Sequence, residues 1–404
     1  MKILLVNNYY YLRGGSERYF FNLFNLLKEA DHEVIPFSVK DERNIASPYE
    51  KYFAQSIHFN NYKLSIKNIK ISLNAIYSIE AKKKIESLIN EIKPDIAHLH
   101  NIYSRISPSI LQVLEKYEIP SIMTLHDYKL ICPVYSFLSN GKICERCKRY
   151  KYYNAVLQRC NKGSIGASVV NCLELYIHKV MKLYEGIKMF IAPSEFMRNK
   201  MIEFGLDRNK ILHIPNFINF NEYSPFYDFK DYFVYVGRIS PEKGIITLIE
   251  AIKYLNINTK LYLIGEGPYE EKVKQIARGI KNVNFVGYQR GDELKSTIKE
   301  SMFVIVPSEW YENFPFAILE AFALGKPVIG SNIGGLPELI KDKFNGLLFE
   351  PKNVNDLANK IQYLLENKEI IPTLGKNARR LIEEKYNSQI HYQELMEVYK
   401  RVRR

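Results

Sequence analysis

The chain has 404 residues, of which 47% are hydrophobic and 25% charged, and its formal net charge is +13. This length is too great for one ordinary core and predicts two globular α/β domains. The charge suits nucleic acid, anionic lipid or phosphorylated substrates. We find no helix-turn-helix, zinc-finger or RNA-binding signature, so we expect no nucleic-acid partner.

No apolar run reaches the roughly 18 to 20 residues that span a bilayer, and the first residues predict a strand, not a secretory leader. We expect a cytoplasmic protein, in solution or peripheral on the inner membrane face.

The N-terminal half alternates short apolar runs with helical periodicity, which is typical of a parallel sheet with crossover helices. Residues 1–214 should therefore form one Rossmann-like domain, with a cysteine-rich insertion at 128–175. Strands are predicted at Ile3–Asn7, Glu33–Phe37, Ile96–His100, Ser121–Leu125 and Met189–Ala192, and helices at Glu17–Leu27, Ser78–Ile92 and Pro108–Lys116.

The second half repeats this alternation. Prolines and asparagines break both periodicities at residues 215–223, which we interpret as a hinge before a second Rossmann-like domain at 224–385. The last helix, 386–404, could pack back on the first domain or cap the second. Predicted strands are Tyr232–Val236, Lys260–Ile264, Asn284–Val286, Phe303–Val306 and Pro327–Gly330, and predicted helices include Gly244–Lys253 and Tyr269–Arg278.

Two loops could bind a phosphate. Gly14 and Gly15 follow the first strand and would let the backbone approach a ligand, with Ser16 as the predicted N-cap of a helix whose N-terminus attracts anions. An ordinary turn between strand and helix would look the same. In the second half, Arg238 and Lys243 lie five residues apart in a loop after a strand, where they could clamp a diphosphate or simply face solvent.

The most informative segment runs from Glu312 through Asn313, Phe314 and Pro315 to Glu320. Pro315 fits the first turn of a helix that should stop at Gly325. Glu312 would lie in the loop before this helix and Glu320 inside it. The rest of that helix is apolar, so the Glu320 carboxylate needs a partner, and two vicinal hydroxyls of a ribose would suit it.

These segments together resemble glycosyltransferase family 4, retaining enzymes of the GT-B fold. The family carries an N-terminal glycine loop, G-R-x4-K-G, G-x-G-P, E-x7-E and a G-K-P-V-[IV] strand, and the resemblance covers nearly the whole chain. The corresponding residues here are Gly14-Gly15, Gly237–Gly244, Gly265–Pro268, Glu312–Glu320 and Gly325–Ile329. The family's inter-domain I-P-N-G-V-D is altered to Ile214–Asn219.

The resemblance implies two Rossmann-like domains facing a cleft and a nucleotide-sugar co-substrate. It assigns Arg238 and Lys243 to the donor diphosphate, Glu312 with the backbone of Asn313 to Pro315 to the transferred sugar, and Glu320 to the ribose. Gly15 would approach the diphosphate, and His126 would lie beside the donor sugar.

The implied reaction is hexosyl transfer with retained anomeric configuration to a glycan or lipid-linked acceptor, as in cell-surface polysaccharide synthesis. Electrostatic stabilisation of the departing diphosphate would drive it. The sequence has no D-x-D triplet, so we expect catalysis without a metal cofactor. Two alternatives share the architecture, a sugar-nucleotide 2-epimerase and a non-catalytic nucleotide-sugar-binding protein.

A basic, amphipathic segment precedes Pro94 and could rest on anionic lipid, although a solvated helix face would look the same. Its residues are Lys63, Lys67, Lys70, Lys82, Lys83 and Lys84, interleaved with Tyr62, Leu64, Ile69, Ile71 and Tyr77.

All five cysteines fall between Cys132 and Cys172, in the order C-x11-C-x2-C-x12-C-x11-C. A cytosolic protein should not keep them as disulfides, and a C-x2-C pair with further thiols suits a structural zinc ion. The candidate ligands are Cys132, Cys144, Cys147 and Cys160, with Cys172 packed in a helix. Neighbouring lysines and arginines should lower the thiol pKa values. The alternative is five reduced thiols, some of them buried.

Overall fold

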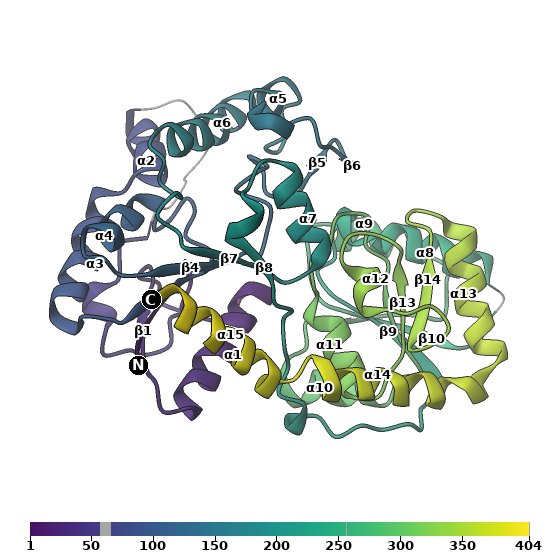
Figure 1. Cartoon of the computed structure of the whole chain (residues 1–404). Coiled ribbons are helices and arrows are strands. Elements are labelled where there is room, and N and C mark those ends of the chain that lie inside the picture. Colours follow the sequence, from purple (N-terminus) through teal and green to yellow (C-terminus); the bar gives the residue numbers. More distant parts are fainter. Residues whose placement is uncertain (57–65, 256, 404) are drawn as a thin grey trace. The chain divides into compact units, whose positions relative to one another are not determined.

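The computed structural model describes residues 1–56, 66–255 and 257–403 (Figure 1). These residues form two compact units, which we call unit 1 (Met1–Ile214 with Tyr392–Arg404) and unit 2 (Pro215–His391). The chain therefore passes between the units twice, after Ile214 and after His391.

Unit 1 contains a six-stranded sheet in the order β2-β1-β3-β4-β7-β8. Every ladder in it is parallel, and the strands are almost entirely buried, as expected for a sheet covered on both faces. The strands are β1 (Lys2–Val6), β2 (Glu33–Phe37), β3 (Ile96–Leu99), β4 (Ser121–Thr124), β7 (Met189–Ala192) and β8 (Ile211–His213). The helices include α1 (Gly15–Glu29), α2 (Ile66–Ile76), α3 (Ile79–Ile92), α4 (Leu111–Lys116) and α7 (Glu195–Glu203).

The insertion between β4 and β7 has secondary structure of its own. It consists of the hairpin β5 (Leu138–Ser139) and β6 (Lys142–Ile143), then α5 (Asn154–Leu157) and α6 (Ile165–Val180). Ser164 caps α6 by accepting a hydrogen bond from the backbone N–H of Ala167. Cys172 lies buried in α6, as the sequence analysis expected of a cysteine packed in a helix.

The C-terminal helix α15 (Ser388–Arg403) belongs to unit 1 from Tyr392 onward. Tyr399 is fully buried, and its hydroxyl lies 2.8 Å from His98 Nδ1 on β3. Arg403 pairs with Asp95 at 3.1 Å. Of the two alternatives from the sequence, the helix returns to the first domain.

Unit 2 contains a second sheet of six parallel strands, in the order β11-β10-β9-β12-β13-β14. The strands are β9 (Tyr232–Val236), β10 (Lys260–Ile264), β11 (Val283–Gly287), β12 (Val304–Val306), β13 (Val328–Ser331) and β14 (Gly346–Phe349). The helices are α8 (Ile245–Tyr254), α9 (Glu270–Ile276), α10 (Gly291–Lys299), α11 (Phe316–Ala323), α12 (Leu336–Leu339), α13 (Val354–Glu366) and α14 (Ile371–Lys385).

Both sheets have the doubly wound arrangement that the sequence predicted. In unit 2, β10 and β11 follow β9 on one side of the sheet, and β12, β13 and β14 follow on the other side. The strand order therefore reverses between β9 and β12. In unit 1 the reversal lies between β1 and β3. Ligands of such sheets bind outside the carboxyl ends of the strands at this point.

Candidate functional site

The three loops of unit 2 that carry the sequence motifs all leave the sheet at the carboxyl ends of its strands. The loop 237–244 follows β9, the loop 265–268 follows β10, and the loop 307–315 follows β12. Because β9 and β12 flank the reversal of strand order, the first and third of these loops lie where a ligand is expected.

Glycines bring these loops into close contact. Gly244 has a φ of +68°, and a Cβ there would collide with the Pro307 carbonyl. A Cβ at Gly334, whose φ is +60°, would also collide with the backbone of Glu312, whose carbonyl accepts a hydrogen bond from Gly335 N. Only glycine adopts this backbone without strain while leaving the neighbouring chain in place. The loop after β13 therefore supports the position of Glu312.

Lys243 and Glu312 meet at this edge of the sheet. Lys243 Nζ lies 2.6 Å from Glu312 Oε1, and Ser308 Oγ donates to the same oxygen at 2.7 Å. The Glu312 side chain is 8% exposed and that of Lys243 is 25% exposed. The sequence brought these residues together only through a family resemblance, and Ser308 was missed because a lone serine in a loop carries no signal.

The charge of Glu312 is stabilised within the protein. Burial favours a raised pKa, but the Lys243 ammonium and the hydrogen bonds from Lys243 and Ser308 outweigh it and hold the pKa of Glu312 below its ordinary value. Glu312 is therefore a carboxylate at neutral pH, although it is buried. A buried carboxylate and a cation at one sheet edge can hold sugar hydroxyls and phosphate oxygens respectively.

The other predicted donor residues of unit 2 lie on the same elements. Arg238 is exposed on the loop after β9 and has no carboxylate partner within the described part of the chain. Glu320 is buried in α11 and accepts a hydrogen bond from Tyr223 Oη at 3.4 Å, which supplies the partner that its burial requires.

The chain between the two glutamates enters α11 one residue later than predicted. Asn313 and Phe314 lead to Pro315, which occupies the N-cap position rather than the first turn. Asn216 Nδ2 donates to the Phe314 carbonyl at 2.9 Å and fixes this backbone. The helix ends before Gly325, whose φ is +75°.

The glycine loop of unit 1 differs in detail from the prediction. Helix α1 begins at Gly15 and its N-cap is Gly14, so Ser16 lies in the first turn. Ser16 Oγ instead donates to Glu17 Oε1 at 3.0 Å. The N-cap prediction was wrong because Gly14 adopts the extended backbone of an N-cap and Gly15 already begins the helix.

His126 follows β4 and contacts two residues that sequence reasoning missed. Its Nε2 lies 3.1 Å from Nδ1 of His100, and the Tyr19 ring packs edge-on against both imidazoles. Burial lowers the pKa of His126 to about 3 and that of His100 well below its usual range, so both rings are neutral at pH 7. The alternation of His98 and His100 along β3, beside β4, was the available signal.

Asp127 is a further titratable group at this end of β4. Burial raises its pKa to about 6, while the backbone N–H of Lys129 (2.8 Å) and the Lys129 charge favour the ionised form. Lys129 is itself buried and pairs with Glu174 of α6 at 2.6 Å. An ion pair therefore ties the insertion to the loop that carries His126.

The predicted zinc site is absent from the described residues. No group of three or more His, Cys, Asp or Glu side chains among them could hold a metal ion. Burial raises the pKa of Cys132 to about 11 and also raises that of Cys147 and Cys160, whereas we had predicted lowered values. For Cys147 and Cys160 the burial comes in part from α6, because its Cys172 and Leu175 belong to the same small apolar cluster. All five cysteines are reduced thiols.

The predicted basic segment lies partly outside the described residues, at Tyr62, Lys63 and Leu64, and the side chains of Lys67, Ile69 and Lys70 are not described either. Of the remainder, Lys82 Nζ bonds to Tyr77 and Gln112, and Lys84 Nζ bonds to the Lys51 carbonyl. These contacts favour the solvated-helix interpretation of α3. Within the part of the chain that the structure covers, no helix is long and apolar enough to cross a membrane.

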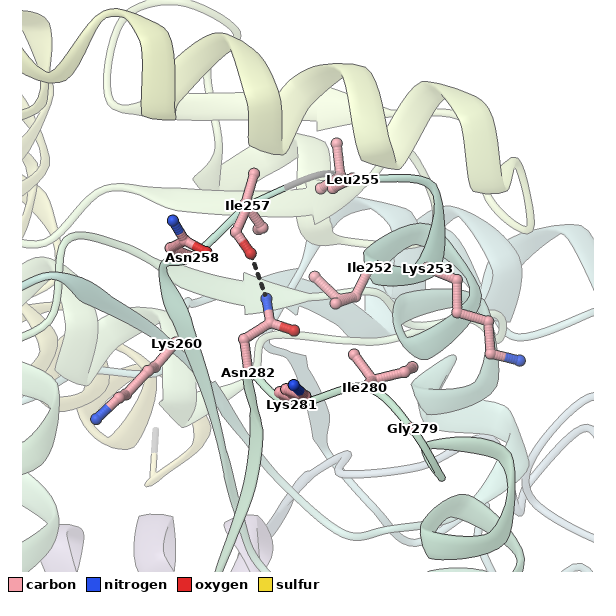
Figure 2. A pocket seen from close by; sticks show the side chains of 10 residues that line it. All are labelled: Ile252, Lys253, Leu255, Ile257, Asn258, Lys260, Gly279, Ile280, Lys281 and Asn282. Atoms are coloured by element: carbon pink, nitrogen blue, oxygen red, sulfur yellow. Dashed lines mark hydrogen bonds between the residues drawn. The ribbon is translucent and has the colours of Figure 1, made fainter.

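A hollow of about 390 Å3 lies at the amino ends of the unit 2 strands, near the starts of β10 and β11 (Figure 2). Ile252, Leu255 and Ile280 form its apolar side, and Asn282 crosses it to donate to the Ile257 carbonyl. The motif loops leave the opposite edge of the sheet, so this hollow is separate from the site.

Comparison with known proteins gives matches over nearly the whole chain. Residues 13–222 match the family described as Glycosyltransferase Family 4, and residues 218–386 match Glycosyl transferases group 1. Over 382 residues the chain is 27% identical to an uncharacterized glycosyltransferase of Methanocaldococcus jannaschii, covering 94% of this chain and 92% of that protein.

One further protein is similar over about half of the sequence, and another is similar in structure. The first is the UDP-Gal:alpha-D-GlcNAc-diphosphoundecaprenol alpha-1,3-galactosyltransferase of Escherichia coli, 28% identical over 207 residues, which are 46% of this chain and 52% of that protein. The second is Anabaena HepE, solved in complex with UDP-glucose, with a TM-score of 0.69, 18% identity and 99% coverage of both chains. The likeness to HepE shows a shared fold.

Proposed function

The chain belongs to glycosyltransferase family 4 and has the GT-B fold. We propose that it transfers a hexose from a nucleoside diphosphate sugar to an acceptor hydroxyl. The acceptor is a glycan or lipid-linked sugar of cell-surface polysaccharide synthesis. Two similarities support this choice, because HepE was solved in complex with UDP-glucose and the Escherichia coli relative is named for a lipid-linked acceptor.

The observation that carries the proposal is the Lys243–Glu312 pair at the reversal of the unit 2 sheet. In the proposed complex, Lys243 and Arg238 bind the diphosphate, and Glu312 with the backbone of Asn313 to Pro315 holds the transferred sugar. Glu320 binds the ribose. Gly14 and Gly15 of unit 1 approach the diphosphate, and His126 contacts the sugar.

The proposed reaction proceeds with retention. The bond between the anomeric carbon and the diphosphate oxygen breaks, the acceptor oxygen attacks from the same face, and the proton of the acceptor hydroxyl leaves with the diphosphate. The cations of Lys243 and Arg238 stabilise the charge that develops on the leaving diphosphate, which is the kind of electrostatic contribution that often dominates catalysis. These two cations supply the neutralisation that a metal ion provides elsewhere, and we propose that catalysis is metal-independent.

A panel of nucleoside diphosphate sugars tests the function. We expect one donor to raise the unfolding temperature, because a ligand at 100 times its Kd stabilises by about 2.7 kcal/mol. With that donor alone, the protein should leave the sugar configuration unchanged. Formation of a C2 epimer would instead show the 2-epimerase, and binding without transfer to any glycan or lipid-linked acceptor would show a non-catalytic binding protein.

The His100–His126 contact gives a prediction for the proposed sugar-binding histidine. Buried His100 Nε2 has no hydrogen-bond partner among the described residues, and an orphaned N–H costs more than an orphaned lone pair. His100 should therefore carry its proton on Nδ1 and donate to His126 Nε2, which leaves the His126 proton on Nδ1.

Long-range 15N–1H NMR of histidine-labelled protein reads this tautomer directly. His100→Asn keeps a donor at the position of Nδ1 and should preserve the Nδ1–H form of His126. His100→Asp offers only an acceptor and should shift the proton to Nε2. The same tautomer in wild type and both variants would contradict the assignment, whatever their activity.

A further inference from the structure

The outward face of the insertion is unusually apolar. Six large apolar or aromatic side chains that α5, α6 and their flanks expose define what we call the α5–α6 face, namely Tyr153, Leu157, Ile165, Leu173, Val180 and Met181. Leu157 is 68% exposed and Val180 is 81% exposed. Single exposed apolar residues are common on soluble proteins, but a concentration of them marks a surface that something covers.

The residues on α6 form one stripe. Ile165, half-buried Val169, Leu173 and Val180 recur at intervals that return to the same side of a helix. The other side of α6 is also largely apolar and packs inward through Cys172 and Leu175. A helix that is apolar on both sides is typical of one that is covered on both sides.

A neighbouring helix of the same unit also exposes an apolar side chain. His178 of α6 bonds to the carbonyl of Ile76, the last residue of α2, at 2.8 Å, and α2 lies beside α6 (Figure 1). Leu73 of α2 is 58% exposed. A second helix that packs against α6 therefore also exposes a large apolar side chain.

Cations surround this face, and the acids near it are neutralised. Residues 142–182 contain nine lysines and arginines but two glutamates. Glu174 is buried against Lys129, and Glu145 pairs with Lys200 at 2.7 Å. The exposed cations include Arg149, Lys151, Arg159, Lys162, Lys179 and Lys182.

We infer that the α5–α6 face binds the surface of an anionic lipid bilayer. Apolar side chains would enter the boundary between headgroups and acyl chains while the surrounding cations contact lipid phosphates. A second copy of the chain is the poorer occupant, because a two-fold contact places each basic rim against itself. The inference is independent of the catalytic proposal, since it uses none of the donor residues.

Flotation with vesicles tests the inference on the full chain. We expect wild-type protein to float with phosphatidylglycerol–phosphatidylcholine vesicles and to stay behind with pure phosphatidylcholine. Leu157→Gln/Leu173→Gln/Val180→Gln should weaken partitioning about tenfold or more, because it removes the inserting groups. Lys151→Glu/Arg159→Glu/Lys162→Glu should abolish the preference for the anionic lipid, as should high salt.

Two matched control variants carry the same kinds of substitution, three to glutamine and three to glutamate, on the surface of unit 2. Tyr254→Gln/Tyr288→Gln/Tyr363→Gln removes three aromatic side chains that are 71%, 61% and 41% exposed. Lys272→Glu/Arg278→Glu/Lys281→Glu reverses three exposed charges. Both controls should float like wild type. The inference is overturned if wild type does not float, if the insertion variants float equally well, or if sedimentation shows a dimer that the apolar triple variant dissociates.

Discussion

Replacing Lys243 with alanine is expected to lower kcat/KM for the donor by roughly 100-fold or more, equivalent to about 3 kcal/mol. The ammonium is proposed to contact the diphosphate, and it also neutralises the buried Glu312 carboxylate. Its removal leaves a buried carboxylate without its cation next to the bound phosphates. Steady-state kinetics with the donor identified by thermal unfolding measures the loss.

Lys253→Ala is the matched control, because Lys253 pairs with Glu250 at 2.8 Å on the exposed surface of the same unit. Exposed pairs contribute little, so this variant should keep kcat/KM within about twofold. Near wild-type turnover in Lys243→Ala would refute the diphosphate assignment. Equal losses in both variants would mean that the surface charge of unit 2 matters rather than this position.

The two glutamates should separate kinetically under the same assay. Glu312→Gln retains the side-chain shape but loses the charge that faces Lys243, so turnover should fall. Glu320→Gln mainly weakens a ribose contact, so the donor KM should rise with kcat largely kept. The reverse pattern would show that their proposed roles are exchanged.

The local sequence was sufficient to predict the position of a motif that directly follows a buried strand. The loop 237–244 and the segment from Glu312 to Glu320 each follow a buried strand, and parallel strands bring such loops to one edge. The predicted strands of both sheets are correct to within a residue or two for the same reason, since buried parallel strands are continuous apolar runs.

The insertion could not be predicted in this way. Its cysteines suggested zinc, but Cys147, Cys160 and Cys172 instead belong to an apolar cluster that α6 helps to form. The Lys129–Glu174 contact joins residues 45 positions apart, and neither residue lies in a recognisable pattern. His100 likewise acquires its role only because β3 and β4 are adjacent. In each case the environment of the residue is set by a contact between positions far apart in the sequence, and local periodicity cannot predict such a contact.

The Lys129–Glu174 pair should be the most sensitive electrostatic contact of unit 1. Both side chains are at most 5% exposed and their charged atoms are 2.6 Å apart. Lys129 Nζ also donates to the Pro133 carbonyl at 2.8 Å, and Ser104 Oγ donates to Glu174 at 3.3 Å. Removing one partner leaves an uncompensated buried charge, which costs about 3–5 kcal/mol.

We therefore expect Lys129→Met to lower the urea midpoint in far-ultraviolet circular dichroism, and Lys129→Met/Glu174→Leu to recover most of the loss, because an apolar pair carries no buried charge. Lys116→Met serves as the control, since it breaks the exposed pair with Glu86, also at 2.6 Å, and should cost at most about 1 kcal/mol. Trp310, the only tryptophan, lies in unit 2, so its fluorescence reports that unit separately. A single variant as stable as the double variant would show that the buried charge is already compensated by water or by other groups.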